Sequence, residues 1–265
     1  MKDFFKDFLL LIHELTYLPL PRRIYALKER LPRAMRYLPV LGLICGAAVF
    51  FSARLAIVMP YSGAAALLVG INLLAGGAQL LRDLMFVASG LMPWQGQATD
   101  KRPFFNMERI NSNEEEIARK ERQYNTTKAG MTWGLVWLLS LFMLYYSFFR
   151  DTTLDSHAFL AASVISRWLM SWLIFYFPAI SPGTLHRGLT RRDFIISSIL
   201  TLLIICLMSR VALYMAFLTA FLGIYLFATA RQRSVGALDE SCYGAACAWG
   251  EVLFLLAWLV FARVF

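Results

Sequence analysis

The sequence predicts an all-α fold: a polytopic membrane helix bundle of about seven transmembrane helices, with the amino terminus in the cytoplasm. Composition gives the first indication, because 59% of the 265 residues are hydrophobic, only 16% are charged and the mean hydropathy is +0.58. Apolar runs close to the ~20 residues that cross a bilayer give the second. These runs cover residues 38–58, 64–81, 130–149, 158–177, 194–209, 211–230 and 245–262.

The residues before the first run, 1–36, are expected to form an interfacial amino-terminal segment. The stretch FFKDFLLLIHELTYLPLP mixes charged with apolar residues, so it lacks the uninterrupted hydrophobic core of a cleavable signal peptide. We expect an amphipathic helix that lies on the membrane and is closed by Pro19 and Pro21.

The fifth and sixth runs are separated only by Arg210. They can form a tight helical hairpin with Arg210 at its tip, which keeps seven spans, or one span and an interfacial piece, which leaves six. No linker to a second folded domain is evident, so residues 1–265 are expected to form a single integral membrane domain. The long polar stretch, 91–129, is expected to be a cytoplasmic loop followed by a solvated helix, because Ser112 and Glu115 have capping-box spacing.

The distribution of Lys and Arg predicts the orientation. Basic residues cluster before the first run, between the second and third, between the fourth and fifth, and after the sixth, whereas the intervening loops hold almost none. The positive-inside rule therefore places these loops in the cytoplasm of a multi-pass inner (plasma) membrane protein. The formal charge of +9 follows mostly from this topology and does not imply nucleic acid. An anionic lipid surface or a phosphate-bearing substrate would account for any positive charge beyond what the topology requires.

Arg167 and Glu251 are ionisable residues well inside apolar runs, where charge is costly and is therefore a functional candidate. Arg167 lies in the middle of the fourth run. Glu251 lies in the last run, where Gly244, Ala248 and Glu251 recur at i, i+4 and i+7 and form a face that another helix can approach closely. Either Arg167 and Glu251 form a buried pair, or Arg167 helps to hold a phosphorylated substrate.

Carboxylates at the cytoplasmic side could bind a magnesium ion. Gln79 and Asp83 are one helical turn apart at the cytoplasmic end of the second run, and Asp239 and Glu240 precede the last run. Mg²⁺ usually takes one or two carboxylates from the protein and completes its octahedron with waters and substrate phosphates. Asp83, Asp239 and Glu240 are therefore candidate ligands; solvated carboxylates at headgroup level are the alternative.

Phosphate could be attracted to NTTKAGMTWG at the entry to the third run, where Lys128 accompanies the amides of a helix start. His186, the histidine of the loop between the fourth and fifth runs, is expected to be solvated. The four cysteines lack zinc-site spacing and are expected to be packing residues. No Walker motif, nucleophile elbow, HExxH or dinucleotide fingerprint occurs.

Several fragments, in order, resemble the cobalamin synthase family, the adenosylcobinamide-GDP ribazoletransferases. They extend over nearly the whole chain: LTYLPLPRR, RYLPVLGLICGA, AGGAQL, TKAGMTWG, the Ser166–Arg167 pair and GALDESCYGAACAWGEVLFLL. The resemblance implies roles in substrate binding for Gly76, Gly77, Gln79, Lys128, Gly130 and Arg167, and roles in catalysis for Asp83 and Glu251.

The chain departs from the family pattern in its acidic motifs. Gln79 stands at the position of the family's histidine, while Leu81 and Met85 replace two aspartates, so that Asp83 corresponds only with a shifted register. Ser241 and Ala248 replace two acids of the carboxy-terminal element. Leucine and methionine cannot hold the divalent ions that neutralise charge on phosphoryl oxygens. Asp83, Asp239 and Glu240 must then form a rearranged metal site, or the chain keeps the scaffold without the chemistry.

The resemblance implies a magnesium-dependent transferase that joins adenosylcobinamide-GDP to α-ribazole, or its phosphate, with release of GMP. One alternative is a catalytically degenerate member that binds corrinoid or acts as a scaffold subunit. Another is a membrane transporter, because helices broken by Gly and charge inside the membrane are also transporter features. The expected partners are the corrinoid nucleotide, α-ribazole, the lipid bilayer, and either a second copy of the chain or other corrinoid-pathway enzymes.

Overall fold

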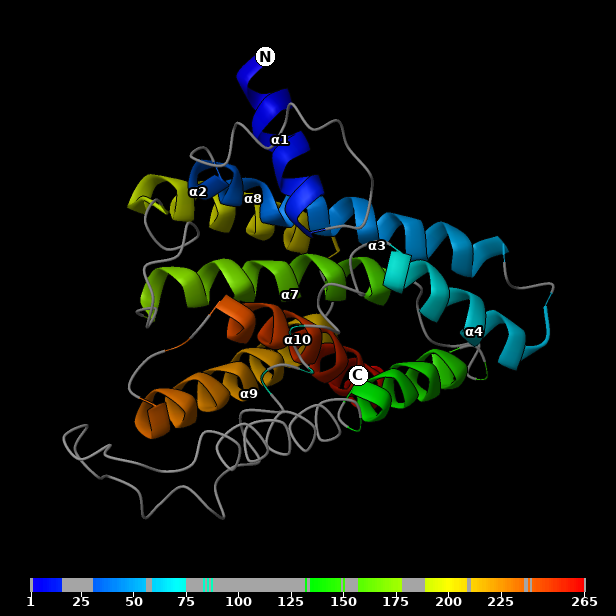
Figure 1. Ribbon diagram of the computed structural model, residues 1–265. Helices are drawn as coiled ribbons and strands as arrows, with labels where there is room; N and C mark the ends of the chain where they lie inside the picture. The colour runs from blue at the N-terminus through cyan, green and yellow to red at the C-terminus, as the bar shows by residue number, and fades with distance from the viewer. Residues whose placement is uncertain are drawn as a thin grey trace, which may run out of the picture.

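The computed structural model describes residues 2–15, 31–55, 59–74, 83, 85, 87, 132, 134–148, 150, 157–177, 189–208, 211–235, 238 and 240–264. The elements of this part are helices, arranged as one bundle (Figure 1). They are α1 (Lys2–Leu15), α2 (Leu31–Ala34), the 3-10 turn η2 (Met35–Tyr37), α3 (Leu38–Leu55), α4 (Tyr61–Asn72), the unlabelled helix Gly134–Phe148, α7 (His157–Tyr176), α8 (Arg191–Met208), α9 (Val211–Val235) and α10 (Glu240–Phe261). The predicted all-α class is confirmed.

Each of the seven predicted apolar runs overlaps one helix, but the helices differ in length. Four stretches are long and apolar enough to cross a membrane: Met35–Arg54, His157–Tyr176, Val211–Arg233 and Ser241–Phe261. The helices α4 and Gly134–Phe148 are shorter as described, and α8 begins with the charged residues Arg191, Arg192 and Asp193. The chain is therefore a multi-pass membrane protein by these criteria, and the count of seven spans stays a prediction.

The fifth and sixth runs are two helices, not one continuous span. α8 ends at Met208 and α9 begins at Val211, while Arg210 lies outside the described residues. In Figure 1, α7 lies between them over much of their length. Trp168 of α7 contacts both helices, because its indole donates to Ser198 of α8 and its ring lies 5.5 Å from that of Phe217 of α9 in a tilted arrangement.

α7 is the most buried of the four long apolar helices and forms the centre of the bundle. It packs antiparallel to α3, which presents Gly42 and Gly46 one turn apart. An ideal Cβ at Gly42 would lie only 2.6 Å from the Ser163 carbonyl oxygen, and one at Gly46 only 2.8 Å from the Leu160 Cα. Missing side chains thus let the two backbones approach closely, as small residues do between membrane helices.

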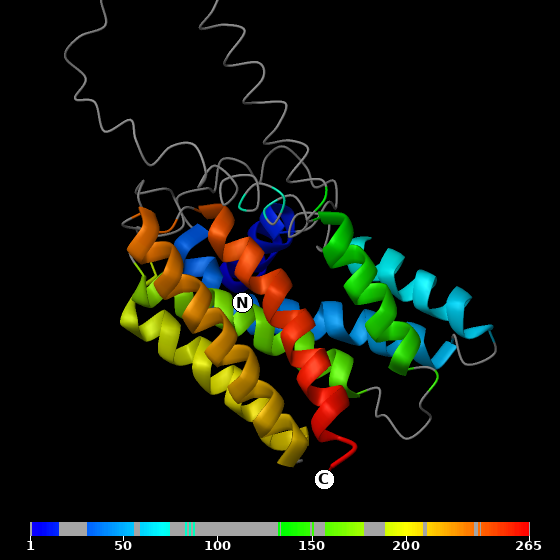
Figure 2. The same cartoon turned by 90° about the horizontal axis from the view of Figure 1, so that it is seen from below.

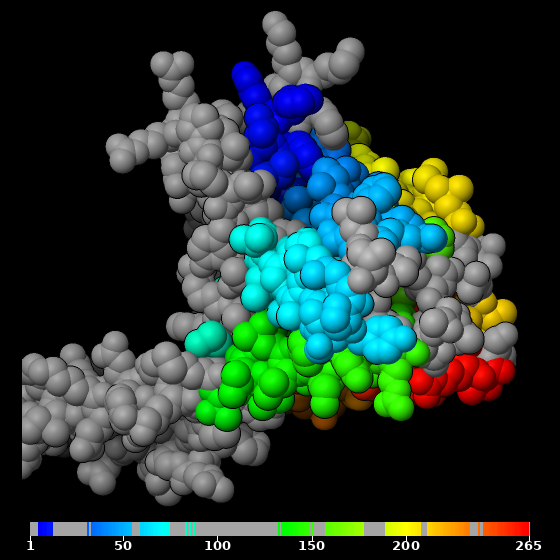
Figure 3. All heavy atoms as spheres, turned by 90° about the vertical axis from the view of Figure 1, so that its right-hand side faces the viewer, coloured from blue at the N-terminus to red at the C-terminus, as the bar shows by residue number. Residues whose placement is uncertain are grey.

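α10 packs against α7 and α9, and α9 and α10 run side by side in Figure 2. Gly250 faces Ser166 and Leu169 of α7, because a Cβ there would lie 3.3 Å from a Leu169 methyl group. The Tyr243 hydroxyl donates to the carbonyl oxygen of Phe177 at 3.4 Å, which joins the start of α10 to the end of α7. In Figure 3, α4 and the helix Gly134–Phe148 lie at the centre of the face that is viewed, with α1 and α3 above them.

α1 crosses the direction of α3 near the start of that helix (Figure 1). Leu10 and Leu11 are fully buried against the bundle, whereas Phe5 is 67% exposed. Arg36 of η2 forms an ion pair with Asp7 of α1 (Nη2 to Oδ2, 3.7 Å) and another with Asp193 of α8 (Nη1 to Oδ1, 3.6 Å). These ion pairs join three elements. The predicted surface helix therefore docks one face on protein, and its contact with lipid stays a prediction.

Candidate functional site

A polar cluster lies inside the bundle between four helices. Asn72 ends α4, Tyr145 belongs to the helix Gly134–Phe148, Arg167 is in the middle of α7 and Glu251 is in α10. The Asn72 Nδ2 group donates to Glu251 Oε1 at 2.7 Å and to the Tyr145 hydroxyl at 3.0 Å. All four residues are at least nine-tenths buried. The cluster therefore satisfies polar groups that would be costly if left unpaired in an apolar interior.

Arg167 reaches the same cluster from α7. Its Nη1 donates to the backbone oxygen of Ser163 at 3.1 Å, and its charge interacts with that of Glu251. The two ion pairs found in the described part of the chain both involve Arg36, so no ion pair within 4.0 Å joins Arg167 to Glu251. Arg167 and Glu251 are therefore buried together but do not form a direct ion pair, and a role of Arg167 in holding a phosphorylated substrate stays a prediction.

The small-residue face of α10 contacts segments from earlier in the chain, as its spacing predicts. Asn72 binds Glu251, and the indole of Trp137 donates to the carbonyl oxygen of Ala248 at 3.2 Å. One turn further toward the start of α10, a Cβ at Gly244 would collide with the carboxylate of Asp83 and would lie 2.8 Å from its Cβ and Cγ. Three consecutive positions on this face thus hold three contacts from distant segments.

Asp83 and the start of α10 are brought together. Glu240 is the first residue of α10 and stands one turn before Gly244, about 6 Å along the axis. Glu251 stands seven residues beyond Gly244, about 10 Å in the other direction. Asp83 therefore lies nearer the charged end of the bundle than the buried cluster does.

Much of the predicted site lies outside the described residues. This holds for Gly76, Gly77, Gln79, Lys128, Gly130, His186 and Asp239, and for the side chain of Glu240. Within the part that the structure describes, no group of three His, Cys, Asp or Glu residues could hold a metal ion. Since two of the three predicted ligands fall outside that part, the magnesium site stays a prediction.

Sequence reasoning missed Asn72, Tyr145 and Trp137. These side chains, an amide, a phenol and an indole, carry no charge at neutral pH, so they do not stand out as charges inside apolar runs. The available signal was Asn72, a polar residue in the second run, because Asn in membrane helices commonly forms hydrogen bonds to other helices. Cys45, Cys242 and Cys247 are buried, in agreement with their prediction as packing residues, whereas Cys206 is exposed on the bundle.

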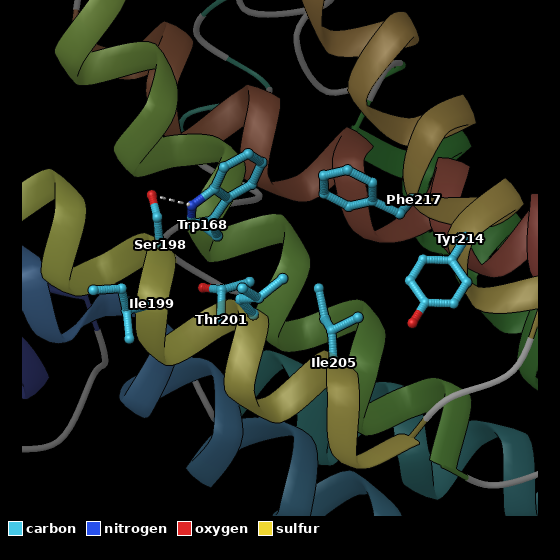
Figure 4. Close-up of a pocket in the computed structure, with 8 residues that line it drawn as sticks. Trp168, Ser198, Ile199, Thr201, Ile205, Tyr214 and Phe217 are labelled. Carbon is cyan, nitrogen blue, oxygen red and sulfur yellow. Dashed lines mark hydrogen bonds between the residues drawn. The ribbon is translucent and has the colours of Figure 1, made fainter.

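A separate cavity of about 310 Å³ lies between α7, α8 and α9 (Figure 4). Two of its polar lining residues form hydrogen bonds, because Trp168 donates to Ser198 and Thr201 donates to the carbonyl oxygen of Ser197. The remaining lining residues are Ile199, Leu202, Ile205, Tyr214 and Phe217. The cavity offers no charged group and is distinct from the polar cluster.

Comparison with known proteins identifies the family. The family model for cobalamin-5-phosphate synthase matches residues 7–100 and 127–259, which is most of the chain. The chain belongs to the cobalamin-5-phosphate synthase family. The matched segments contain Asp83, Glu251 and every other predicted site residue, whereas residues 101–126 of the predicted polar loop are unmatched.

A curated relative supports the same family. The chain is 26% identical over 252 residues to the adenosylcobinamide-GDP ribazoletransferase of Desulfitobacterium hafniense (strain Y51), and the alignment covers 91% of this chain and 92% of that protein. No solved structure matches the chain. The resemblance drawn from the sequence fragments is therefore confirmed at the level of the family.

Proposed function

We propose that the chain is a membrane-embedded adenosylcobinamide-GDP ribazoletransferase, which joins adenosylcobinamide-GDP to α-ribazole or its phosphate. Membership of the family and the name of the relative from Desulfitobacterium hafniense support this activity. The structural observation behind the proposal is the packing of the Asp83 carboxylate against Gly244, one turn after Glu240. Two acidic segments far apart in the chain thus meet at one end of the bundle.

The reaction is a phosphoryl transfer. A hydroxyl oxygen of the ribazole attacks the phosphorus on the corrinoid side of the pyrophosphate and loses its proton to water. The bond between that phosphorus and the bridging oxygen breaks, and GMP leaves with the electron pair. Asp83, Asp239 and Glu240 would hold Mg²⁺, because hard carboxylate oxygens suit this ion. When bound, the ion would neutralise charge on the phosphoryl oxygens.

The basic residues of the proposal attract the phosphates. Lys128 lies at a predicted helix start, where backbone amides favour anions. Arg167 supplies a positive charge from within the bundle. Glu251 orients that charge, because its own carboxylate is held by a hydrogen bond from Asn72. The site is proposed to face the cytoplasm, because the loops rich in Lys and Arg adjoin this end of the bundle.

A second candidate is a non-catalytic family member that binds or presents corrinoid to another enzyme. The observation in its favour is the replacement of family aspartates by Leu81 and Met85. Apolar side chains at these positions cannot bind a metal ion. This candidate predicts corrinoid binding without release of GMP.

Complementation of a cell that lacks cobalamin synthase tests the proposal. The parent chain, Asp83→Asn and Asp239→Asn are expressed to equal levels, and cobalamin-dependent growth is measured. We expect rescue by the parent and failure of both variants, because an amide removes the negative charge that holds the ion. Rescue by all three would refute the assigned ligands, and an expressed parent that does not rescue would favour the non-catalytic candidate.

A further inference from the structure

We propose that Asn72 is a positioning residue for this reaction and acts through Glu251; the inference rests on the proposed transferase function. Asn72 ends α4 and is 6% exposed. It lies outside every fragment on which the family resemblance was based. Its role follows from the contacts that its side chain makes with two other helices.

The Asn72 amide is the common donor of a three-residue network. Its Nδ2 lies 2.7 Å from Glu251 Oε1, in the short range typical of hydrogen bonds to charged acceptors. The same nitrogen lies 3.0 Å from the Tyr145 hydroxyl. One buried amide thus fixes the carboxylate and the phenol relative to each other, so the rotation of both side chains is restricted.

The position of Asn72 in the chain links this network to Asp83. Asn72 contacts α10 at Glu251, and Asp83, eleven residues later, contacts α10 at Gly244. The two contacts are seven residues apart on one face of α10, or about 10 Å. Asn72 and Asp83 stand on either side of the segment that contains Gly76, Gly77 and Gln79. Both residues therefore contact the same helix, α10.

Loss of the amide would release Glu251. The carboxylate is buried in the same cluster as Arg167 but forms no ion pair with it within 4.0 Å. Without its short bond to Asn72, the carboxylate is expected to turn toward the guanidinium and displace it from its contact with Ser163. Displacement by about 1 Å of groups that orient a substrate can lower turnover by about 100-fold.

The test uses the full chain purified in lipid nanodiscs, with Mg²⁺-dependent GMP release from adenosylcobinamide-GDP and α-ribazole as the assay. We expect Asn72→Leu to lower kcat by about 10- to 100-fold, the range for residues that orient an active-site group, and to change KM less. The matched control is Thr201→Val, which removes another buried hydrogen bond, from Thr201 to Ser197. Its kcat should stay within about twofold of the parent.

A double variant tests whether Asn72 acts through Glu251. Added to Glu251→Gln, Asn72→Leu should cause little further loss of kcat, because coupled residues are non-additive. A full second loss would overturn the inference. Asn72→Ser, which keeps a hydroxyl donor too short to bridge both partners, replaces Asn72→Leu if the latter does not assemble, and the same outcomes apply.

The outcomes separate this inference from the proposed function. A parent that releases GMP, with an Asn72→Leu variant of unchanged kcat, would overturn the positioning role and leave the transferase intact. The same holds if Asn72→Leu lowers only the thermal unfolding temperature, as a purely structural role predicts. A folded parent that binds corrinoid but releases no GMP would overturn the function, and the inference with it.

Discussion

Gly244 contributes to the candidate site through the side chain that it lacks. Asp83 occupies the space beside this glycine, and its carboxylate, Cβ and Cγ would all contact an added methyl group. Rotation of the carboxylate alone cannot relieve such a contact, because the Cβ of Asp83 would still lie 2.8 Å away. The position of a candidate metal ligand therefore depends on a residue of another helix.

Gly244→Ala should displace Asp83 and lower Mg²⁺-dependent GMP release by about 10-fold or more. Gly70→Ala is the matched control, because nothing lies within 4 Å of a Cβ at Gly70 of α4. The control should keep its activity and gain up to about 1 kcal/mol of stability from the better helix propensity of Ala. GMP release and thermal unfolding of both variants check this; equal activity of the two would contradict the placement of Asp83.

The contact between α3 and α7 brings the polar groups of the bundle into register. Gly42 leaves room for both the Ser163 carbonyl oxygen and the Arg167 side chain, whose Cδ would lie 3.1 Å from an added Cβ. The other end of this helix pair is closed by stacking of Phe50 on His157 at 5.1 Å. The glycines of α3 therefore determine how closely the Arg167 side chain packs against that helix.

Gly42→Ala should destabilise the protein, because the added methyl group meets backbone atoms that cannot rotate away. Overpacking of this kind costs about 1–3 kcal/mol. Gly63→Ala is the control, since Gly63 of α4 has open space at its Cβ. Thermal unfolding of both variants in the same detergent measures the difference, and a Gly42→Ala midpoint at or above that of the control would be inconsistent with the close approach of α3 and α7.

The contacts between distant elements place the charged helix ends together. Arg36 binds Asp7 and Asp193, Tyr243 binds Phe177, and Asp83 packs on Gly244. The starts of α3, α8 and α10 and the end of α7 therefore lie at one end of the bundle. The alternation of basic and non-basic loops requires this arrangement if all basic loops face one side of the membrane.

The orientation of the whole molecule can be tested by labelling. In a Cys206→Ala background, Ser62→Cys at the start of α4 should react with a membrane-impermeant maleimide in intact cells, because this end is predicted to be external. Arg233→Cys at the end of α9 should react only after permeabilisation. Ser62 and Arg233 are both exposed, so access is limited by the membrane alone. The opposite labelling pattern would reverse the predicted topology.

The sequence by itself determined the helical class, the seven apolar runs and the family. Hydropathy and charge distribution are properties of consecutive residues, so they can be read without knowledge of contacts. The same local information marked Arg167 and Glu251 as unusual, because each is a charge in an apolar run. It could not show whether the two form a direct pair.

Only the tertiary structure decided which polar groups meet. Asn72 binds Glu251 across 179 residues of sequence, and Trp137 binds Ala248 across 111. Such contacts depend on the rotation of each helix about its axis and on how closely glycines let the helices approach. Neither quantity is fixed by the hydropathy of a single segment, because an apolar face looks the same in sequence whichever neighbour covers it.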